Sequence, residues 1–184
     1  HVLDRMNEDE LAMFRRDNIG IILQAFHLIP TMTALENVAV PLELAGVNDA
    51  EAKAKEMLTD VGLDHRMDHY PTQLSGGEQQ RVSVARSFVN RPPIMLCDEP
   101  TGNLDPKTSV GIMRLLDRIN RTGTTIVMAT HDHAIVDAMK RRVVALDAVV
   151  PDLAGRERAV GIERGLALER ALQGGRPGAA VPDA

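Results

Sequence analysis

The sequence predicts an α/β fold, in which a parallel sheet core carries an inserted helical subdomain. In the second half of the chain, short apolar segments alternate with amphipathic segments of helical period, as strands and crossover helices do in a parallel sheet. Earlier in the chain, residues 30–90 carry helical signals almost throughout. The composition agrees with a chain that buries a core, since 44% of the residues are hydrophobic.

Residues 1–29 are predicted to contain one helix and one strand of the core. Asn7, with a glutamate three residues later, has the spacing of a capping box and predicts a helix over about residues 8–16. The apolar residues 19–23 then predict a short strand that ends at Gln24. A polar side chain at a strand end faces a site or solvent, so Gln24 is a candidate site residue.

Residues 30–90 form the predicted helical subdomain. Three pairs in it have the spacing at which a polar side chain and a glutamate three residues later bond each other's backbone amides at a helix start. The pairs are Thr33 with Glu36, Asn48 with Glu51, and Ser75 with Glu78. Each pair predicts the start of a helix, and the second opens an alanine-rich amphipathic stretch.

Residues 91–147 return to the sheet. The apolar residues 94–97 are too few for a helix and do not alternate with polar ones, so they predict a buried parallel strand. Asp98 and Glu99 follow this strand at once. Asp105 is expected to cap the next helix. The apolar face of that helix comprises Val110, Met113, Leu116 and Ile119.

Two further strands complete the alternation. Residues 124–129 predict a strand ending close to His131, and Asp132 is expected to cap a helix that runs to about Arg141. Residues 143–146 predict a third strand. Ligands bind beyond the carboxyl ends of parallel strands. The polar residues expected at that edge are Gln24, Asp98, Glu99 and His131.

Residues 148–184 are rich in arginine, glycine, alanine and proline, and they show no clear strand. They predict a flexible tail, and a helix over about residues 156–172 is the alternative. No functional residue is assigned to this section.

Asp98 and Glu99 have the chemistry that phosphoryl transfer needs. One carboxylate can bind Mg²⁺, directly or through water, and the next can orient a water molecule for attack on a γ-phosphate. A strand followed by two acids is also the ordinary pattern of a solvated turn, so the pair needs support from other segments. His131 raises the same choice, because it can donate to a phosphate oxygen or serve only as a cap or core residue.

Support comes from residues 74–80, with the sequence Leu-Ser-Gly-Gly-Glu-Gln-Gln. Gly76 and Gly77 leave backbone amides open at a predicted helix start, where the helix dipole favours an anion. An isolated Ser-Gly-Gly is more often a glycine turn with an ordinary cap. Here Arg81, the strand and its two acids follow in order, which favours the phosphate-binding interpretation.

These ordered segments resemble the motifs of ATP-binding cassette (ABC) transporter ATPases, whose core is a P-loop NTPase-type sheet. Residues 74–80 resemble the signature motif of that family, and residues 94–99 resemble its Walker B strand with the catalytic glutamate. Residues 102–105 resemble the D-loop. Gln24 resembles the Q-loop glutamine, and His131 resembles the switch histidine.

The resemblance implies an ATPase whose cofactors are ATP and Mg²⁺. It implies catalytic roles for Glu99 and His131, which would polarise the hydrolytic water and sense the γ-phosphate. It implies that Asp98 holds the metal, and that Gln24 links nucleotide and metal to a transmembrane partner. The activity and the cofactors are thus expectations that depend on the family motifs.

The resemblance also implies a head-to-tail dimer with a second ATPase subunit, working on a transmembrane permease-type subunit. Asn103 and Asp105 would lie at the D-loop contact of this dimer. The location implied is cytoplasmic and peripheral, on the inner face of the cell membrane through the partner. The residues that would contact the ATP held by the second subunit are Ser75, Gly76, Gly77 and Gln79.

The resemblance covers about residues 1–147 and divides between two related groups. Residues 26–38 resemble the ATPases of lipoprotein-release and macrolide-export systems. Residues 120–133 resemble the FtsE-like cell-division ATPases. The class of protein follows from the shared motifs, whereas the cargo and the permease stay open.

The sequence contains no Gly-x-x-x-x-Gly-Lys-Ser/Thr loop, and none of its lysines follows a glycine. This Walker A loop cradles the β- and γ-phosphates in P-loop ATPases. We therefore expect an incomplete, N-terminally truncated core and a chain that does not hydrolyse ATP by itself. A non-catalytic interaction module is the alternative function for such a chain.

Charge and spacing argue against other classes of protein. The formal net charge of -5 offers no field for nucleic acid, so no direct nucleic-acid partner is expected. DNA-repair ATPases of related sequence have a long coiled coil between Q-loop and signature motif, and no heptad run separates Gln24 from Leu74. Cys97, the single cysteine, cannot form an internal disulfide and is expected to be a small buried residue.

Overall fold

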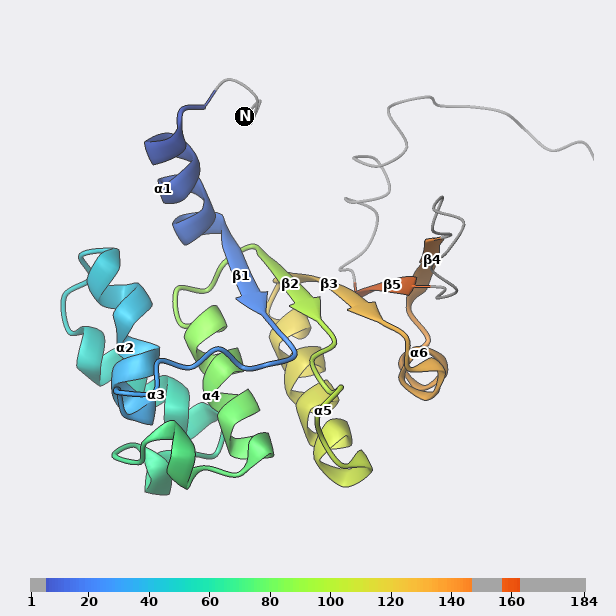
Figure 1. The fold of residues 1–184 in the computed structure, drawn as a ribbon. Coiled ribbons are helices and arrows are strands. Elements are labelled where there is room, and N and C mark those ends of the chain that lie inside the picture. The colour runs from blue at the N-terminus through green and yellow to red at the C-terminus, as the bar shows by residue number, and fades with distance from the viewer. Residues whose placement is uncertain (1–5, 147–156, 163–184) are drawn as a thin grey trace, which may run out of the picture.

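Figure 1 shows a sheet with helices gathered below it and an N-terminal helix that leads into its first strand. The computed structural model describes residues 6–146 and 157–162. The sheet has the strand order β1-β2-β3-β5-β4. The strands are β1 (Ile19–Ile22), β2 (Ile94–Asp98), β3 (Thr125–Thr130), β4 (Arg142–Leu146) and β5 (Glu157–Ile162). The helices are α1 (Glu8–Asn18), α2 (Ala34–Leu44), α3 (Ala50–Asp60), α4 (Gly76–Phe88), α5 (Pro106–Arg121) and α6 (His133–Met139), with short 3-10 turns at Asp64–Arg66 and Pro71–Gln73.

Reciprocal capping boxes start three of these helices. Asn7, Thr33 and Ser75 each accept a hydrogen bond from the backbone amide three residues on, and the glutamate there accepts one from the cap residue's own amide. These bonds satisfy donors that a helix start otherwise leaves without partners. The capping box predicted at Asn48 is wrong, because α3 is preceded by Asp49, which has a left-handed backbone (φ 60°) and makes no side-chain cap bond.

The parallel strands β1, β2 and β3 pack one face on the helices below them (Figure 1). Ile22, Met95 and Met128, one from each strand, are completely buried in this layer. The opposite face carries Ile21 and Leu96, which are 48% and 40% exposed. Residues 94–97 were predicted to be buried on both faces, and this is wrong for the described residues because alternate side chains of β2 lie on an open face.

The far edge of the sheet differs from the predicted parallel order. β4 runs in the direction of β3, but β5 lies between them and is antiparallel to both. Residues 157–162 belong to the section predicted to be a tail without a strand, so the tail prediction and its helical alternative are wrong at these positions. Backbone pairing on both sides explains the strand, because each neighbour satisfies the amides and carbonyls of β5. Residues 147–156 and 163–184 lie outside the described residues.

The helix after Asp105 follows the predicted start but not the whole predicted face. The Asp105 carboxylate accepts from the backbone amides of Lys107 at 3.1 Å and Thr108 at 3.0 Å. Of the predicted face, Met113, Leu116 and Ile119 are buried. Val110 is 50% exposed, because it lies in the first turns of α5 beside a groove rather than in the core.

The last described helix is shorter than predicted. Asp132 caps α6 as expected, with its carboxylate accepting from Ala134 and Ile135 amides. The helix ends at Met139 instead of Arg141, because Lys140 adopts a left-handed conformation (φ 49°). Cys97 is buried as predicted, and burial raises the pKa of its thiol to about 12. Within residues 6–146 and 157–162, every helix falls short of the length and apolarity that crossing a membrane requires.

Candidate functional site

The carboxyl ends of three neighbouring strands bring the predicted core residues to one edge of the sheet. β1, β2 and β3 are parallel and in register, with Ile22 opposite Cys97 and Cys97 opposite Met128. Gln24 therefore lies just after the end of β1, and His131 directly follows β3. Asp98 is the last residue of β2, and Glu99 comes directly after it. The structure thus places the predicted polar residues at the edge where α/β proteins bind ligands.

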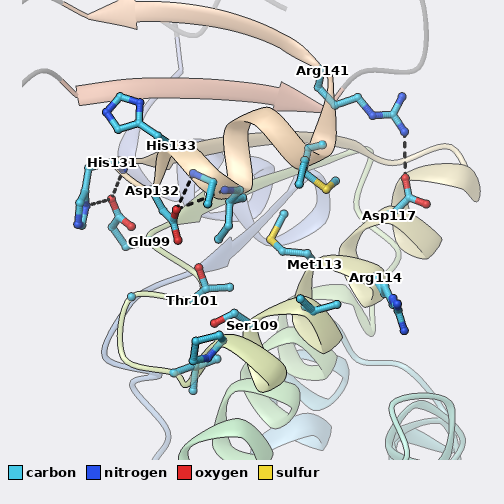
Figure 2. A pocket seen from close by; sticks show the side chains of 18 of the residues that line it. Glu99, Thr101, Ser109, Met113, Arg114, Asp117, His131, Asp132, His133 and Arg141 are labelled. Atoms are coloured by element: carbon cyan, nitrogen blue, oxygen red, sulfur yellow. Dashed lines mark hydrogen bonds and ion pairs between the residues drawn. The ribbon is translucent and has the colours of Figure 1, made fainter.

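Glu99 and His131 are in direct contact at this edge (Figure 2). The Glu99 Oε1 atom lies 2.6 Å from His131 Nδ1 and accepts the His131 backbone amide at 2.7 Å. The other carboxylate oxygen, Oε2, accepts the Thr130 hydroxyl at 3.1 Å. The Glu99 side chain is 16% exposed and that of His131 is 75% exposed. A largely covered carboxylate is therefore fixed by the Thr130 hydroxyl, the His131 backbone amide and the His131 ring nitrogen.

The backbone at Glu99 explains why two adjacent acids have different surroundings. Glu99 has a positive φ of 43°, which is rare for a residue with a side chain and persists only where neighbours hold it. Its amide still pairs with the Ala129 carbonyl at 3.0 Å, so the strand pairing continues while the side chain turns toward His131. Asp98 remains part of β2, with an exposed carboxylate.

The signature residues form the first turn of α4. The Ser75 hydroxyl accepts the Glu78 amide at 3.3 Å, and the Gln79 side chain donates to the Leu74 carbonyl at 3.0 Å. Arg66 adds a contact of 3.1 Å to Glu78. These bonds fix the turn, and its free amides lie at the positive end of the helix dipole, where an anion is favoured.

Gly77 has a packing role that sequence reasoning did not reveal. A Cβ atom at this position would collide with the Thr108 side chain, so α4 approaches α5 this closely only because residue 77 is glycine. Thr108 in turn belongs to the cap of α5, since its amide and hydroxyl both donate to Asp105. The signature turn therefore packs directly on the helix that follows the D-loop.

The D-loop also contacts the Q-loop residue. The Asn103 side-chain amide donates to the Gln24 backbone carbonyl oxygen at 3.1 Å. The side-chain nitrogen Nε2 of Gln24 lies 3.5 Å from Asn103 Oδ1. The structure thus joins Gln24 to Asn103 and Glu99 to His131. The Asp105 carboxylate caps α5, and its contribution to a dimer contact stays a prediction.

A groove of about 1020 Å³ runs between α5 and α6, from Glu99 and His131 at one end to Asp117 at the other. Figure 2 shows the labelled side chains around it, with Arg141 paired to Asp117 at the far end. Its middle is lined by apolar side chains such as Met113. The acid and histidine are therefore reached from this groove.

Two residues to which sequence reasoning gave no site role support Glu99 and the residue that follows it. Thr130 donates to the carboxylate, and Gln80 is completely buried with its Nε2 atom 2.6 Å from the Pro100 carbonyl. Gln80 lies three residues after Gly77 on the buried face of α4, so helical periodicity could have identified it. No local signal identifies Thr130, because its partner lies on another strand.

The oxygen donors at this edge fit Mg²⁺ only as part of a ligand set. The described residues hold no group of three or more His, Cys, Asp or Glu side chains that could bind a metal. Mg²⁺ in nucleotide sites takes one or two carboxylates and completes its shell with water and phosphate oxygens. The exposed carboxylate of Asp98 and the side-chain amide oxygen of Gln24 can supply this small number of protein ligands.

Comparison with known proteins agrees with this geometry. The ABC transporter family model matches residues 3–102, which include the Q-loop residue, the signature motif and the Walker B acids. The chain belongs to the ABC transporter family. The family expected from the sequence is thereby confirmed.

Two relatives and one solved structure define the similarity within the ABC transporter family. The cell division ATP-binding protein FtsE of Bacillus subtilis (strain 168) is 50% identical over 147 residues, which cover 79% of this chain and 64% of that protein. The lipoprotein-releasing system ATP-binding protein LolD of Geobacter metallireducens is 49% identical over 149 residues, covering 79% and 66%. The chain spans slightly less than two thirds of these relatives.

The solved structure is the dimeric post-hydrolysis state of the ATP-binding cassette MJ0796, bound to ADP and Pi. It has a TM-score of 0.64 and 43% sequence identity, covering 72% of this chain and 60% of that one. The alignment supports the arrangement of strands and helices described above for the ABC fold.

Proposed function

We propose that the chain forms the greater part of an ATP-binding subunit, which couples ATP binding and hydrolysis to a transmembrane partner. The observation that carries this proposal is the contact of 2.6 Å between the Glu99 carboxylate and His131 at the carboxyl edge of the parallel strands. A carboxylate held there can polarise water, and an imidazole beside it can meet a γ-phosphate. The sequence match with ATP-binding relatives supports the same role.

The acceptor capacity of Glu99 leaves room for the hydrolytic water. An ionised carboxylate offers about four lone-pair positions. The Thr130 hydroxyl and the His131 backbone amide take two of them, and the His131 ring nitrogen lies against a third. The remaining position on Oε2 can accept a water proton while the water oxygen attacks the γ-phosphorus and the bond to the ADP oxygen breaks. Mg²⁺, held by Asp98 with Gln24 beside it, would neutralise charge developing on the phosphate oxygens.

The signature turn takes a second role in this proposal. Ser75, Gly76, Gly77 and Gln79 would contact the ATP held by a second subunit in a head-to-tail dimer, with Asn103 and Asp105 at the D-loop contact. The dimeric MJ0796 structure, bound to ADP and Pi, supports such an assembly. The contact between Asn103 and Gln24 would connect this dimer contact with the Q-loop.

The membrane partner is inferred from the relatives. The two relatives compared are named for cell division and for lipoprotein release, so we propose a permease-type subunit of a transport or cell-division complex. The protein would then lie at the inner face of the membrane through this partner. The ATP-driven step is common to both processes, and the cargo is not part of the proposal.

Replacing Glu99 tests the proposal. In the intact gene product, Glu99→Gln should lower the ATP turnover rate by about 10²-fold to 10⁴-fold, because the amide cannot accept a proton from water. ATP binding, measured by equilibrium titration, should persist. Glu56→Gln, an exposed change on α3, is the matched control and should leave turnover unaltered. Unchanged turnover in the Glu99 variant would contradict the assignment.

A second candidate function is a non-catalytic interaction module. The absence of a Walker A loop from the 184 residues favours it for this stretch of sequence taken alone. Turnover assays on the 184-residue chain and on the intact gene product separate the two functions. Activity only in the intact product supports the ATPase, and inactivity of both supports the module. Robust turnover by the 184-residue chain would contradict the need for the loop.

A further inference from the structure

Two consecutive residues just after the Q-loop have an unusual backbone. Phe26 and His27 have φ values of 60° and 48°, in the left-handed region that residues with a Cβ atom avoid. Each is disfavoured relative to the right-handed form, because the Cβ atom lies too close to the following carbonyl oxygen. Such a pair persists only when neighbouring groups hold it. Within the described residues, the backbone amides of Phe26 and His27 donate only to the Leu23 and Ala25 carbonyls.

Arg86, in the last turn of the signature helix α4, holds these two residues in place. Its Nη1 atom donates to the His27 carbonyl oxygen at 2.7 Å, and its Nη2 atom donates to the Phe26 carbonyl oxygen at 3.0 Å. The planar guanidinium thus bridges both left-handed residues at once. Burial lowers the pKa of Arg86, and no carboxylate within the described chain offsets that effect.

The same loop touches the first turn of α4. The Phe26 ring approaches Gly76, with its Cζ atom 3.8 Å from the position that a Cβ on Gly76 would take. The Cδ2 atom of Leu104, in the D-loop, lies 3.5 Å from the same Cβ position. The loop after Gln24 is therefore fastened at one end of the signature helix by Arg86 and rests against its other end through an aromatic ring.

We propose that Arg86 is a positioning residue that holds residues 24–27 on the signature helix, so that the Q-loop and the signature motif move as one unit. Loss of the bridge lets Phe26 and His27 relax to ordinary backbone angles. The Phe26 ring then moves away from Gly76, and the same loop loses the contact between Gln24 and Asn103. The consequence for turnover rests on the function proposed above, whereas the consequence for the loop does not.

The test uses a glycine rescue. Glycine adopts positive φ without a Cβ penalty, and His27 is exposed, so His27→Gly relieves the loop without disturbing the core. Hydrogen exchange of the peptide spanning residues 24–29 in the full chain is the measurement. Arg86→Ala should speed exchange by roughly 10-fold to 100-fold, since two charged hydrogen bonds are lost. In the double variant Arg86→Ala with His27→Gly, this peptide should exchange roughly threefold more slowly than in Arg86→Ala alone.

Asp49→Gly is the matched control. Asp49 also has a left-handed backbone (φ 60°), but it lies before α3 and is not bonded to Arg86. Combined with Arg86→Ala, it should leave the fast exchange of residues 24–29 unchanged. Equal rescue by Asp49→Gly and His27→Gly, or no rescue by either, would overturn the proposal and leave Arg86 as a general stabiliser of α4.

A conservative variant covers the case in which Arg86→Ala does not fold. Arg86→Lys keeps the charge, but an ammonium lacks the planar fork and cannot bridge two carbonyls in the same way. It should speed exchange of the peptide by roughly tenfold. Exchange equal to that of the unsubstituted chain would show that the bridge does not hold the loop.

In the intact gene product, Arg86→Lys should reduce partner-stimulated turnover, and His27→Gly should restore part of it. Restored loop protection without restored turnover would contradict the positioning role, even though the bridge itself exists. The Glu99→Gln experiment fails or succeeds independently of the exchange data, so failure of the ATPase proposal and failure of this one give different results.

Discussion

At the scale of single residues, Glu99 is defined by the donors around it. Thr130 and the amide and ring of His131 hold its carboxylate at distances from 2.6 to 3.1 Å. A carboxylate with fixed partners needs little reorganisation when charge develops on a bound phosphate, which is the advantage of a preorganised site. Adjacent acids were predictable from the sequence, but the different surroundings of Asp98 and Glu99 follow from the positive φ at Glu99.

Removing the imidazole tests this arrangement. In the intact gene product, His131→Ala should lower the rate constant of ATP hydrolysis by about 10²-fold, the usual effect of removing one donor from developing charge. Nucleotide affinity should change far less, because phosphate binding does not depend on one exposed ring. Single-turnover kinetics and equilibrium titration give the two numbers separately. Equal losses in both would identify a structural histidine.

At the scale of elements, α4 connects the parts of the site. Its first turn is the signature motif, its buried Gln80 bonds the Pro100 carbonyl beside Glu99, and its last turn carries Arg86. Gly77 lets the helix pack on Thr108 of α5. One helix therefore touches Pro100 directly after the Walker B acids, the helix that follows the D-loop, and the loop after Gln24.

The packing at Gly77 gives a prediction about stability. Gly77→Ala should lower the free energy of unfolding of the full chain by about 1–3 kcal/mol, because the added methyl group overpacks the contact with Thr108. Thr108→Ser removes the colliding methyl group and keeps the hydroxyl that bonds Asp105. The double variant should regain part of the loss in urea unfolding. Strictly additive losses would show that this contact is not the cause.

The cap at Ser75 gives a prediction about pH. Bonding from the Ser75 amide lowers the pKa of Glu78 below its usual 4.5, so this carboxylate stabilises the fold above pH 4.5 and the benefit is lost as pH falls through the lowered pKa. Glu78→Gln should cost about 1 kcal/mol at neutral pH and flatten the decline in stability in acid. Thermal unfolding between about pH 3 and pH 7 measures both effects. An unchanged acid decline would exclude Glu78 as its source.

At the scale of the whole molecule, the sheet edge and the signature turn are separate sites of one chain. Glu99 and His131 meet at the strand ends, whereas Gly76 faces Leu104 of the D-loop and the Phe26 ring, and Gly77 faces Thr108 of α5. Within the described residues, no hydrogen bond joins the 74–77 turn to Glu99 or His131. This separation agrees with a dimer in which the two sites serve different nucleotides.

A charge placed at Ser75 tests the dimer. In a Glu99→Gln background of the intact gene product, Ser75→Asp should abolish ATP-dependent dimerisation, because its carboxylate repels the phosphates of the facing nucleotide. Aspartate and asparagine are both good N-caps, so Ser75→Asn is the control and should still dimerise. Light scattering after size exclusion measures the dimer. Loss of ATP binding by the single subunit as well would contradict a role in the second subunit's site.

Sequence patterns predicted the features that depend on neighbouring residues. The caps at Asn7, Thr33 and Ser75 were correct, because a capping box is decided by residues three apart. The cap at Asn48 was wrong, although it has the same spacing, because the left-handed Asp49 precedes the helix and α3 begins at Ala50. Spacing permits a cap, and the approach of the preceding chain decides whether it forms.

The sequence by itself determined the family, the order of strands and helices up to β4, and the residue types at the strand ends. Tertiary structure alone decided that β5 enters the sheet between β3 and β4, that Thr130 and His131 hold Glu99, and that Arg86 bridges Phe26 and His27. The physical reason is range. Helical period, capping and apolar runs act over a few residues, whereas strand pairing and carboxylate contacts join residues that only the folded chain brings together.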